Sequence, residues 1–225
     1  THWGETEAFD HLKQHLNRLK VPLRLLVGNH DDRDVFRQWF GDHPCDENGF
    51  IQSVEDLPVG RFVYLDTNEP GYHEGWYCEQ RLQWLERQFA DAKGKDLYLF
   101  MHHPPFEIGI PALDRISLVQ KEAFSEVIKP YRDQIRHLFF GHIHRPLSGS
   151  WLGIPISSLR GMNHQLQLDM TDRSLQGNFE PPAYCVVLFR DDTLIVHTHD
   201  FMDSSPKFDV ARSPVQDWAV MKPYS

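Results

Sequence analysis

The sequence has little cysteine, no long apolar run and a deficit of positive charge. Its three cysteines (Cys45, Cys78 and Cys185) are odd in number, far apart and outside any CxxC pattern, which favours reduced thiols in a cytoplasmic protein over a disulfide framework. No apolar run approaches the ~20 residues needed to cross a bilayer, so we expect no membrane association. The chain has 23 Lys and Arg against 32 Asp and Glu, a net charge of −9. This balance argues against a polynucleotide partner, but it allows a small phosphate substrate because bound metal ions can supply local positive charge.

The length and composition fit one packed domain. The chain has 225 residues, of which 40% are hydrophobic, and that is enough for a single large core. We expect one folded domain over residues 1–200 and a polar, proline-containing tail over residues 201–225. The tail is a candidate oligomerisation arm, which, with the last strands, could pack against a partner subunit in a homo-oligomer.

The apolar periodicity predicts strands and helices in alternation up to about residue 145, and mainly antiparallel strands after it. Helix 5–20 carries Phe9, Leu12, Leu16 and Leu19 on one face, and Asp191-Asp192 is a plausible hairpin turn. Residues 104–116 are expected to form a long loop. The predicted helices are 5–20, 34–40, 79–90 and Ser117 to Pro130, and the predicted strands are 23–27, 50–51, 61–66, 97–101, 135–140, 150–158, 183–189 and 193–199.

Three of these strands are followed directly by side chains that can bind metal ions. Gly28-Asn29-His30-Asp31 follows strand 23–27, and His102-His103-Pro104-Pro105 follows strand 97–101. Gly141-His142-Ile143-His144 follows strand 135–140. Each motif taken singly has an ordinary explanation, as a turn, a strand stopped by prolines or a surface pair. Because α/β sheets bind ligands at the carboxyl ends of their strands, the three together predict one shared site.

The chemistry of such a site follows from its donor atoms. Imidazole nitrogens, an amide oxygen and carboxylates suit Zn, Mn, Fe or Co. His142 and His144 point the same way if their segment is extended, so they could share one ion or reach two adjacent ions. Two ions ~4 Å apart can activate a bridging hydroxide and stabilise in-line displacement at phosphorus. His30, beside a candidate ligand but not itself counted among the ligands, is placed to stabilise the transition state or protonate the leaving oxygen.

The three motifs together resemble those of calcineurin-like metallophosphoesterases, with similarity running from Thr1 to about Asp169. Within that superfamily, Gly28-Asn29-His30-Asp31-Asp32 with His102-His103-Pro104-Pro105 looks closest to the bacterial class III cyclic-nucleotide phosphodiesterases and glycerophosphodiesterases. The resemblance implies an α/β (α+β) fold, a four-layer αββα sandwich, with two divalent metal ions (Fe, Mn, Zn or Co). It also implies hydrolysis of a small phosphodiester, a glycerophosphodiester or a cyclic nucleotide, by attack of a metal-bound hydroxide.

The resemblance also implies residue roles. Asn29, His102 and His142 would bind one metal ion and His144 the other, while His30 would be the catalytic, substrate-contacting histidine that binds no metal. The choice of His102 over its neighbour His103 follows the family pattern and not the spacing. His164, in Gly161-Met162-Asn163-His164, resembles a glycerophosphodiesterase histidine at the substrate pocket, and the alternative is an ordinary loop histidine.

Two earlier motifs of the family are absent from the printed residues: an Asp-x-His, and a Gly-Asp whose Asp bridges the two metal ions. Thr1-His2-Trp3-Gly4 resembles the sequence that follows the Gly-Asp, so we expect an upstream segment that carries both motifs and the first strand of the sheet. The alternative function is a catalytically inactive interaction scaffold on the same fold. A structural zinc module is disfavoured because no cysteine lies near these histidines in the sequence.

Overall fold

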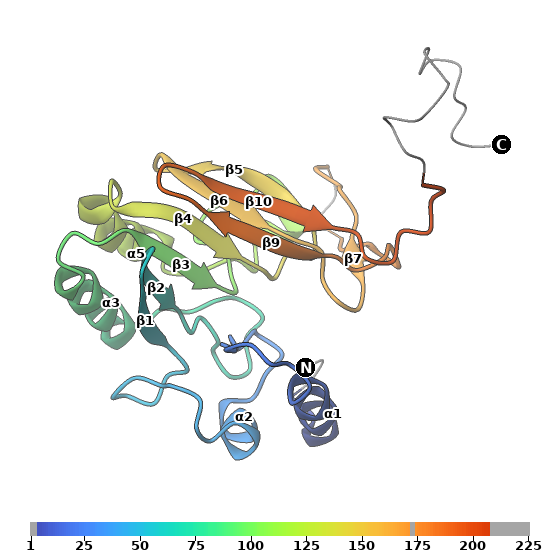
Figure 1. Cartoon of the computed structure of the whole chain (residues 1–225), viewed down its shortest axis with the longest axis horizontal. Coiled ribbons are helices and arrows are strands. Elements are labelled where there is room, and N and C mark those ends of the chain that lie inside the picture. Colours follow the sequence, from blue (N-terminus) through green and yellow to red (C-terminus); the bar gives the residue numbers. More distant parts are fainter. Residues whose placement is uncertain (1–3, 172–173, 208–225) are drawn as a thin grey trace, which may run out of the picture.

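The computed structural model describes residues 4–171 and 174–207 (Figure 1). Its centre is a six-stranded mixed sheet in the spatial order β1-β2-β3-β4-β6-β5. Strands β2, β3, β4 and β6 run parallel, whereas β1 and β5 run antiparallel to their neighbours at the two edges. The strands are, in that order, β1 (Ser53–Leu57), β2 (Gly60–Tyr64), β3 (Leu97–Met101), β4 (Ile135–Phe140), β6 (Ile154–Ser158) and β5 (Leu147–Trp151).

One face of this sheet packs against two helices, α3 (Glu79–Asp91) and α5 (Lys121–Ile128), the second continued by the 3₁₀ turn η1 (Lys129–Tyr131). The predicted helix 79–90 is confirmed as α3, whose Leu82, Leu85 and Phe89 are all buried. Burial of each such side chain stabilises the fold by about 1.5–3 kcal/mol. The core lies between these helices and alternate strand residues such as Leu99 and Leu138. This packing fixes the ends of β3 and β4, where two of the three motifs begin.

The opposite face of the sheet is aromatic and carries a second, two-stranded sheet. Strands β9 (Tyr184–Phe189) and β10 (Leu194–His199) form an antiparallel hairpin, closed by the predicted turn at Asp191-Asp192. The ring of Phe189 lies 5.4 Å from that of Phe62 and 5.0 Å from that of Tyr98, measured between centroids. The hairpin is drawn in orange-red across the main sheet in Figure 1. The expected α/β class, with helices on one sheet face and a second sheet on the other, is therefore confirmed.

A smaller core joins the two helices nearest the amino terminus, α1 (Thr6–Leu16) and α2 (Arg33–Trp39). The predicted helix 34–40 is confirmed as α2, and it begins where the Asp32 carboxylate accepts the N–H groups of Asp34 and Val35. The predicted helix 5–20 is shorter than expected and ends at Leu16. Only Phe9 of its apolar face is buried. Leu19 lies beyond the helix and is 50% exposed, so too little apolar contact is available to extend the helix.

The predicted strand 23–27 is wrong in one respect. The segment is extended but belongs to no strand of the described sheets. Its polar groups are satisfied by side chains, since the Leu25 N–H donates to the His43 ring at 2.9 Å and the Gly28 N–H to Asp31 at 2.8 Å. Val27 is fully buried in the small core. The apolar pattern of residues 23–27 therefore reports their burial, and among the described strands the segment has no pairing partner.

Other expected boundaries also move. The short strand expected at 50–51 lies a few residues later, as β1. The helix expected to begin at Ser117 is α5, which begins at Lys121, because the Ser117 hydroxyl donates to the Asp114 carbonyl instead of capping a helix. The expected loop 104–116 contains a short helix, α4 (Pro111–Asp114). The predicted strand 150–158 is divided between β5 and β6 by a turn at Leu152-Gly153, where both residues have positive φ. A small pair, β7 (Gln165–Leu166) with β8 (Gly177–Asn178), was not predicted.

The remaining expectations concern the thiols, the membrane and the tail. All three cysteines are free, as expected for reduced thiols. Within residues 4–171 and 174–207, every helix is too short or too polar to cross a membrane. Residues 201–207 of the predicted tail form no helix or strand, and residues 208–225 lie outside the described residues. The boundary between domain and tail therefore stays a prediction.

Candidate metal centre

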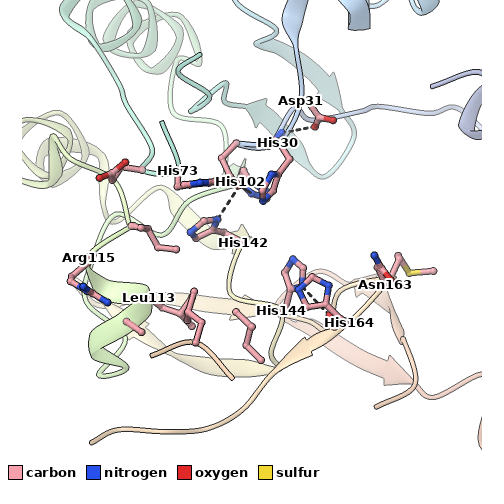
Figure 2. A pocket seen from close by; sticks show the side chains of 18 of the residues that line it. His30, Asp31, His73, His102, Leu113, Arg115, His142, His144, Asn163 and His164 are labelled. Atoms are coloured by element: carbon pink, nitrogen blue, oxygen red, sulfur yellow. Dashed lines mark hydrogen bonds between the residues drawn. The ribbon is translucent and has the colours of Figure 1, made fainter. Parts of the chain in front are cut away.

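The three predicted motifs meet at one place (Figure 2). Strands β3 and β4 are parallel neighbours, so His102 and His142 leave the sheet on the same edge. The Gly141 N–H donates to the His102 carbonyl at 3.0 Å, which ties the two strand ends together. The Gly28–Asp31 turn lies against them so closely that a Cβ on Gly28 would come within 2.8 Å of the His102 ring. A glycine is therefore required at position 28 by the approach of that imidazole.

The Gly28–Asp31 turn is held rigid by hydrogen bonds from both sides. The Asp31 carboxylate accepts the Gly28 N–H at 2.8 Å, and the Asp31 N–H donates back to the Gly28 carbonyl at 3.1 Å. The Asn68 amide donates to the Asp31 carbonyl at 2.9 Å. Next to it, Arg33 forms a two-pronged ion pair with the fully buried Asp66, at 2.7 and 3.0 Å. The planar geometry of this bidentate pair fixes the turn to the segment that follows β2.

The Asn29 side chain is the point on which the site converges. Its Oδ1 lies 2.9 Å from Nε2 of His102 and 3.3 Å from Nδ1 of His142. Nε2 of His142 is buried and has no hydrogen-bond partner among the described residues. A buried polar atom without a partner is costly unless a ligand binds it. The three residues thus present an oxygen and imidazole nitrogens to one point.

The structure distinguishes His102 from His103. Ligand atoms of His102, His103 and His142 all lie within 4.8 Å of one another, so distance alone admits each of them. Both ring nitrogens of His103 are already used, however, Nδ1 with the Thr67 hydroxyl at 2.7 Å and Nε2 with the His73 carbonyl at 3.2 Å. His103 is therefore held by hydrogen bonds on both sides of its ring, and the choice of His102 as the metal ligand stays a prediction.

His142 and His144 do not lie on an extended segment, so the condition under which their rings would point the same way is not met. Their φ angles are 67° and 48°, in the left-handed region that residues with side chains rarely adopt. Such strain is retained where the surroundings impose it, often at functional sites. The two turns direct His142 toward Asn29 and His144 toward His164 (Figure 2). Both rings line the same cavity, although not by the alternation of a strand.

His144 and His164 form the other side of the site. Nδ1 of His144 donates to the backbone carbonyl of His164 at 2.9 Å, and the two rings lie 4.5 Å apart. The His164 side chain lines the cavity, as expected for a substrate-pocket residue. Its role stays a prediction.

His30 lines the cavity on the side of His102 (Figure 2), and beside it is His73, a histidine that the sequence reasoning missed. The His30 and His73 rings are 5.4 Å apart, and Nδ1 of His73 lies 3.3 Å from the Asn29 amide nitrogen. Because that amide nitrogen can only donate, His73 accepts its hydrogen bond and helps turn Oδ1 toward His102 and His142. His73 belongs to the loop after β2, so its place beyond another parallel strand was the signal that could have found it.

The imidazoles at the centre are held neutral. Burial, reinforced by the proximity of His144 and His30, lowers the pKa of His102 to about 3. Burial lowers the pKa of His142 and His103 well below the usual value, with repulsion between the neighbouring rings adding to it. Burial also lowers the pKa of His144. Because metal ions bind the neutral imidazole, these rings need lose no proton before binding at neutral pH.

The cavity above these residues has a volume of about 1030 Å³. Its histidine-rich wall faces a second wall with an apolar surface and one guanidinium group, that of Arg115 (Figure 2). The donor set fits a divalent metal: an amide oxygen, neutral imidazoles and a buried nitrogen without a partner. The apolar and cationic residues that line the cavity are Leu26, Ala112, Leu113, Arg115, Ile116, Met162, Leu166 and Leu175.

Comparison with known proteins defines the class. The family model described as calcineurin-like phosphoesterase matches residues 2–146, and the chain belongs to this family. It is 42% identical over 92% of its length to a probable cyclic nucleotide phosphodiesterase of Rhodopseudomonas palustris, covering 77% of that protein. It is 32% identical over 80% of its length to a probable glycerophosphodiester phosphodiesterase of Arcobacter nitrofigilis, covering 67% of it.

A solved structure supports the fold. A dimetal phosphatase from Danio rerio superposes with a TM-score of 0.57 at 20% identity, covering 69% of this chain and 66% of that one. At this identity the likeness establishes the fold alone. The resemblance read from the three motifs is confirmed by the family match.

Proposed function

We propose that the chain is a dinuclear-metal phosphodiesterase that hydrolyses a small phosphodiester, a glycerophosphodiester or a cyclic nucleotide. The observation that carries the proposal is the convergence of His102 and His142 on the Asn29 amide oxygen at the floor of the cavity. The names of the two relatives, one a cyclic nucleotide phosphodiesterase and one a glycerophosphodiester phosphodiesterase, support a diester over a monoester substrate.

Asn29, His102 and His142 would hold one divalent ion, and His144 would supply a ligand to the second. Bound ions of this kind lower the pKa of water and neutralise charge on phosphoryl oxygens. The identity of the ions, among Fe, Mn, Zn and Co, is left to measurement. The chain's own contribution is placement: strand ends, the Gly28–Asp31 turn and neutral imidazoles hold the ligands before an ion arrives.

His30 would act on the substrate and not on the metal. Hydrolysis adds water to phosphorus and breaks one ester P–O bond, and the departing alcohol oxygen needs a proton. His30 lines the cavity beside the proposed ligand Asn29 and can supply that proton. His164, on the cavity wall next to His144, would contact the substrate. The apolar wall opposite would take the part of the diester that carries no charge.

The test is hydrolysis of bis(p-nitrophenyl) phosphate by the full-length protein, including any segment upstream of Thr1. The assay is run with Mn²⁺, Co²⁺ or Zn²⁺ and with EDTA, beside the p-nitrophenyl monoester. We expect turnover that needs metal and favours the diester. Competition by a glycerophosphodiester or by a 3′,5′-cyclic nucleotide then identifies the natural class. Absence of turnover with every divalent ion would contradict the proposal and favour the inactive scaffold.

Two finer expectations are also proposed. The free state of the three thiols supports a cytoplasmic location. The half-exposed Tyr184, Val186 and Ile195 on one face of the β9–β10 hairpin support a homo-oligomer. Light scattering after size-exclusion chromatography tests the second expectation, and a monomer at micromolar concentration would contradict it.

A further inference from the structure

The hydrogen bond from His144 to the His164 carbonyl determines the tautomer of His144. A carbonyl oxygen can only accept, so Nδ1 of His144 must carry the proton. The lone pair is then on Nε2, the only ring nitrogen left to bind a metal ion. Contacts that fix the second nitrogen of a ligand histidine in this way set its tautomer and ring orientation.

The loop that carries the His164 carbonyl is held by a buried side chain, that of Gln165. Its Oε1 accepts the Gly161 N–H at 2.8 Å, and its Nε2 donates to the Gly161 carbonyl at 2.8 Å. Nε2 also reaches the Glu180 carbonyl at 3.3 Å. Gln165 is 1% exposed, so water cannot replace these bonds. The amide thus closes the loop 161–165, which contains His164, into a fixed ring.

Gly161 is in contact with both partners of the His144 hydrogen bond. A Cβ at this position would lie 2.9 Å from Nδ1 of His144 and 2.9 Å from the His164 carbonyl oxygen. Only a hydrogen atom fits there. The loop therefore meets His144 at two points, a hydrogen bond and a tight van der Waals contact.

We propose that Gln165 is a positioning residue for the second metal ion, acting through the Gly161–Gln165 loop on the tautomer and placement of His144. The inference rests on the proposed function, which assigns His144 to that ion. Gln165 touches neither metal nor substrate. Its effect passes through the His164 carbonyl, so its loss is expected to loosen His144 while leaving Asn29, His102 and His142 in place on the sheet.

The first measurement uses metal-free protein. Two-bond ¹H–¹⁵N correlation spectra of the imidazoles distinguish a ring protonated at Nδ1 from one protonated at Nε2. We expect His144 to be protonated at Nδ1 in the wild type and to become a mixture of tautomers in Gln165→Leu. An unchanged His144 pattern in Gln165→Leu would overturn the proposal.

The second measurement is Co²⁺ binding to the full-length protein, which is monitored by calorimetry and by visible absorption. In Gln165→Leu we expect the weaker of two binding steps to lose about tenfold in affinity, with the tighter step unchanged. Equal weakening of both steps, or of neither, would contradict a role confined to His144.

Gln52→Leu is the matched control. Gln52 is as deeply buried as Gln165, donates to Asp46 at 2.7 Å and accepts from Tyr77 at 3.0 Å, outside the cavity. Its substitution should lower thermal stability without changing the His144 tautomer or the weaker Co²⁺ step. If Gln165→Leu does not fold, Gly161→Ala tests the same contact while keeping the Gln165 side chain, and the same two changes are expected.

Neither measurement involves turnover. A protein that shows both changes but hydrolyses no diester would contradict the proposed function and leave the positioning role in place. A wild-type protein that binds one Co²⁺ only would contradict the assignment of His144 to a second ion, while the tautomer spectra would still decide what Gln165 does.

Discussion

The two sides of the histidine site are held by different kinds of structure. His102 and His142 follow adjacent parallel strands, and both rings contact the Asn29 amide oxygen. His144 lies past the strand end and is held by a carbonyl in the loop 161–165. The first side is therefore built on the central sheet, and the second on a loop closed by side-chain hydrogen bonds.

This difference has consequences for how the site can vary. A ligand at the carboxyl end of a central strand is held in place by the packing of the whole core. It can therefore be moved only at a large loss of stability. A ligand held by a short loop can be tuned by changes within that loop. The sheet-held side is expected to bind its ion more tightly, and the loop-held side to respond more to substitution.

The largest effect is expected from Asn29→Ala, which removes the atom that both rings of the sheet-held side contact. Metal content should fall, and diester hydrolysis should drop by about 10³-fold, since the metal supplies several kcal/mol of transition-state stabilisation. Metal analysis with assays on the diester measures both. Asn17→Ala, at an exposed position after α1, is the matched control and should change neither. Full metal content in Asn29→Ala would contradict the assignment.

The next effect separates catalysis from metal binding. His30→Gln should lower kcat by about 10²–10⁴-fold, the usual contribution of a proton donor, because the leaving oxygen loses its proton source. Both ions should stay bound, which metal analysis of the purified variant checks. His11→Gln, on the exposed face of α1, provides the control for a general histidine loss. A variant that loses metal would instead make His30 part of the metal site.

A smaller effect tests how closely the turn approaches the sheet. A Cβ on Gly28 would lie 2.8 Å from the His102 ring, whereas one on Gly141 would lie 3.5 Å from it, an ordinary contact distance. Gly28→Ala should therefore displace His102 and weaken the tighter metal step by about tenfold, on the scale of second-shell changes. Gly141→Ala should weaken it less. Calorimetric titration with Mn²⁺ compares the two, and equal affinities would show that the turn can relax around a methyl group.

Much of the sheet-held side could be predicted from the sequence. Strands 97–101 and 135–140 were placed correctly because a parallel strand buried on both faces is a continuous apolar run. The ends of these two strands carry His102 and His142 and then had to meet, next to the turn that carries Asn29. The first apolar run, 23–27, carries a similar pattern but pairs with no described strand, because apolar spacing reports burial and not hydrogen-bond partners.

The loop-held side could not be predicted in the same way. The left-handed backbone at His142 and His144 leaves no mark in the hydrophobic pattern, so the directions of their rings could not be derived from it. The contacts of Gln165 with Gly161 and of His144 with His164 join residues whose spacing has no regular period. His73 was missed for the same reason: its hydrogen bond to Asn29 spans two loops.

The last expected effect lies away from both sides of the site, and it sharpens the comparison by showing what burial alone does to an imidazole. His137 of β4 is buried, accepts or donates a hydrogen bond with the Ser157 hydroxyl at 2.8 Å, and stacks on Phe139. Burial lowers its pKa to about 4.

Between pH 6.5 and 4 the unfolded chain binds a proton at His137 and the folded chain does not, so stability falls as the pH falls. From the linkage of pKa to stability, the loss reaches about 3 kcal/mol near pH 4. His137→Gln keeps a hydrogen-bonding side chain beside Ser157 but cannot titrate, so its stability should fall less over this range. Urea unfolding of both proteins in EDTA, at pH 7, 5.5 and 4.5, measures the difference. The other buried histidines are present in both proteins, so their contributions to the pH dependence cancel in the comparison. Equal losses of unfolding free energy in the two proteins would show that His137 is protonated in the folded state.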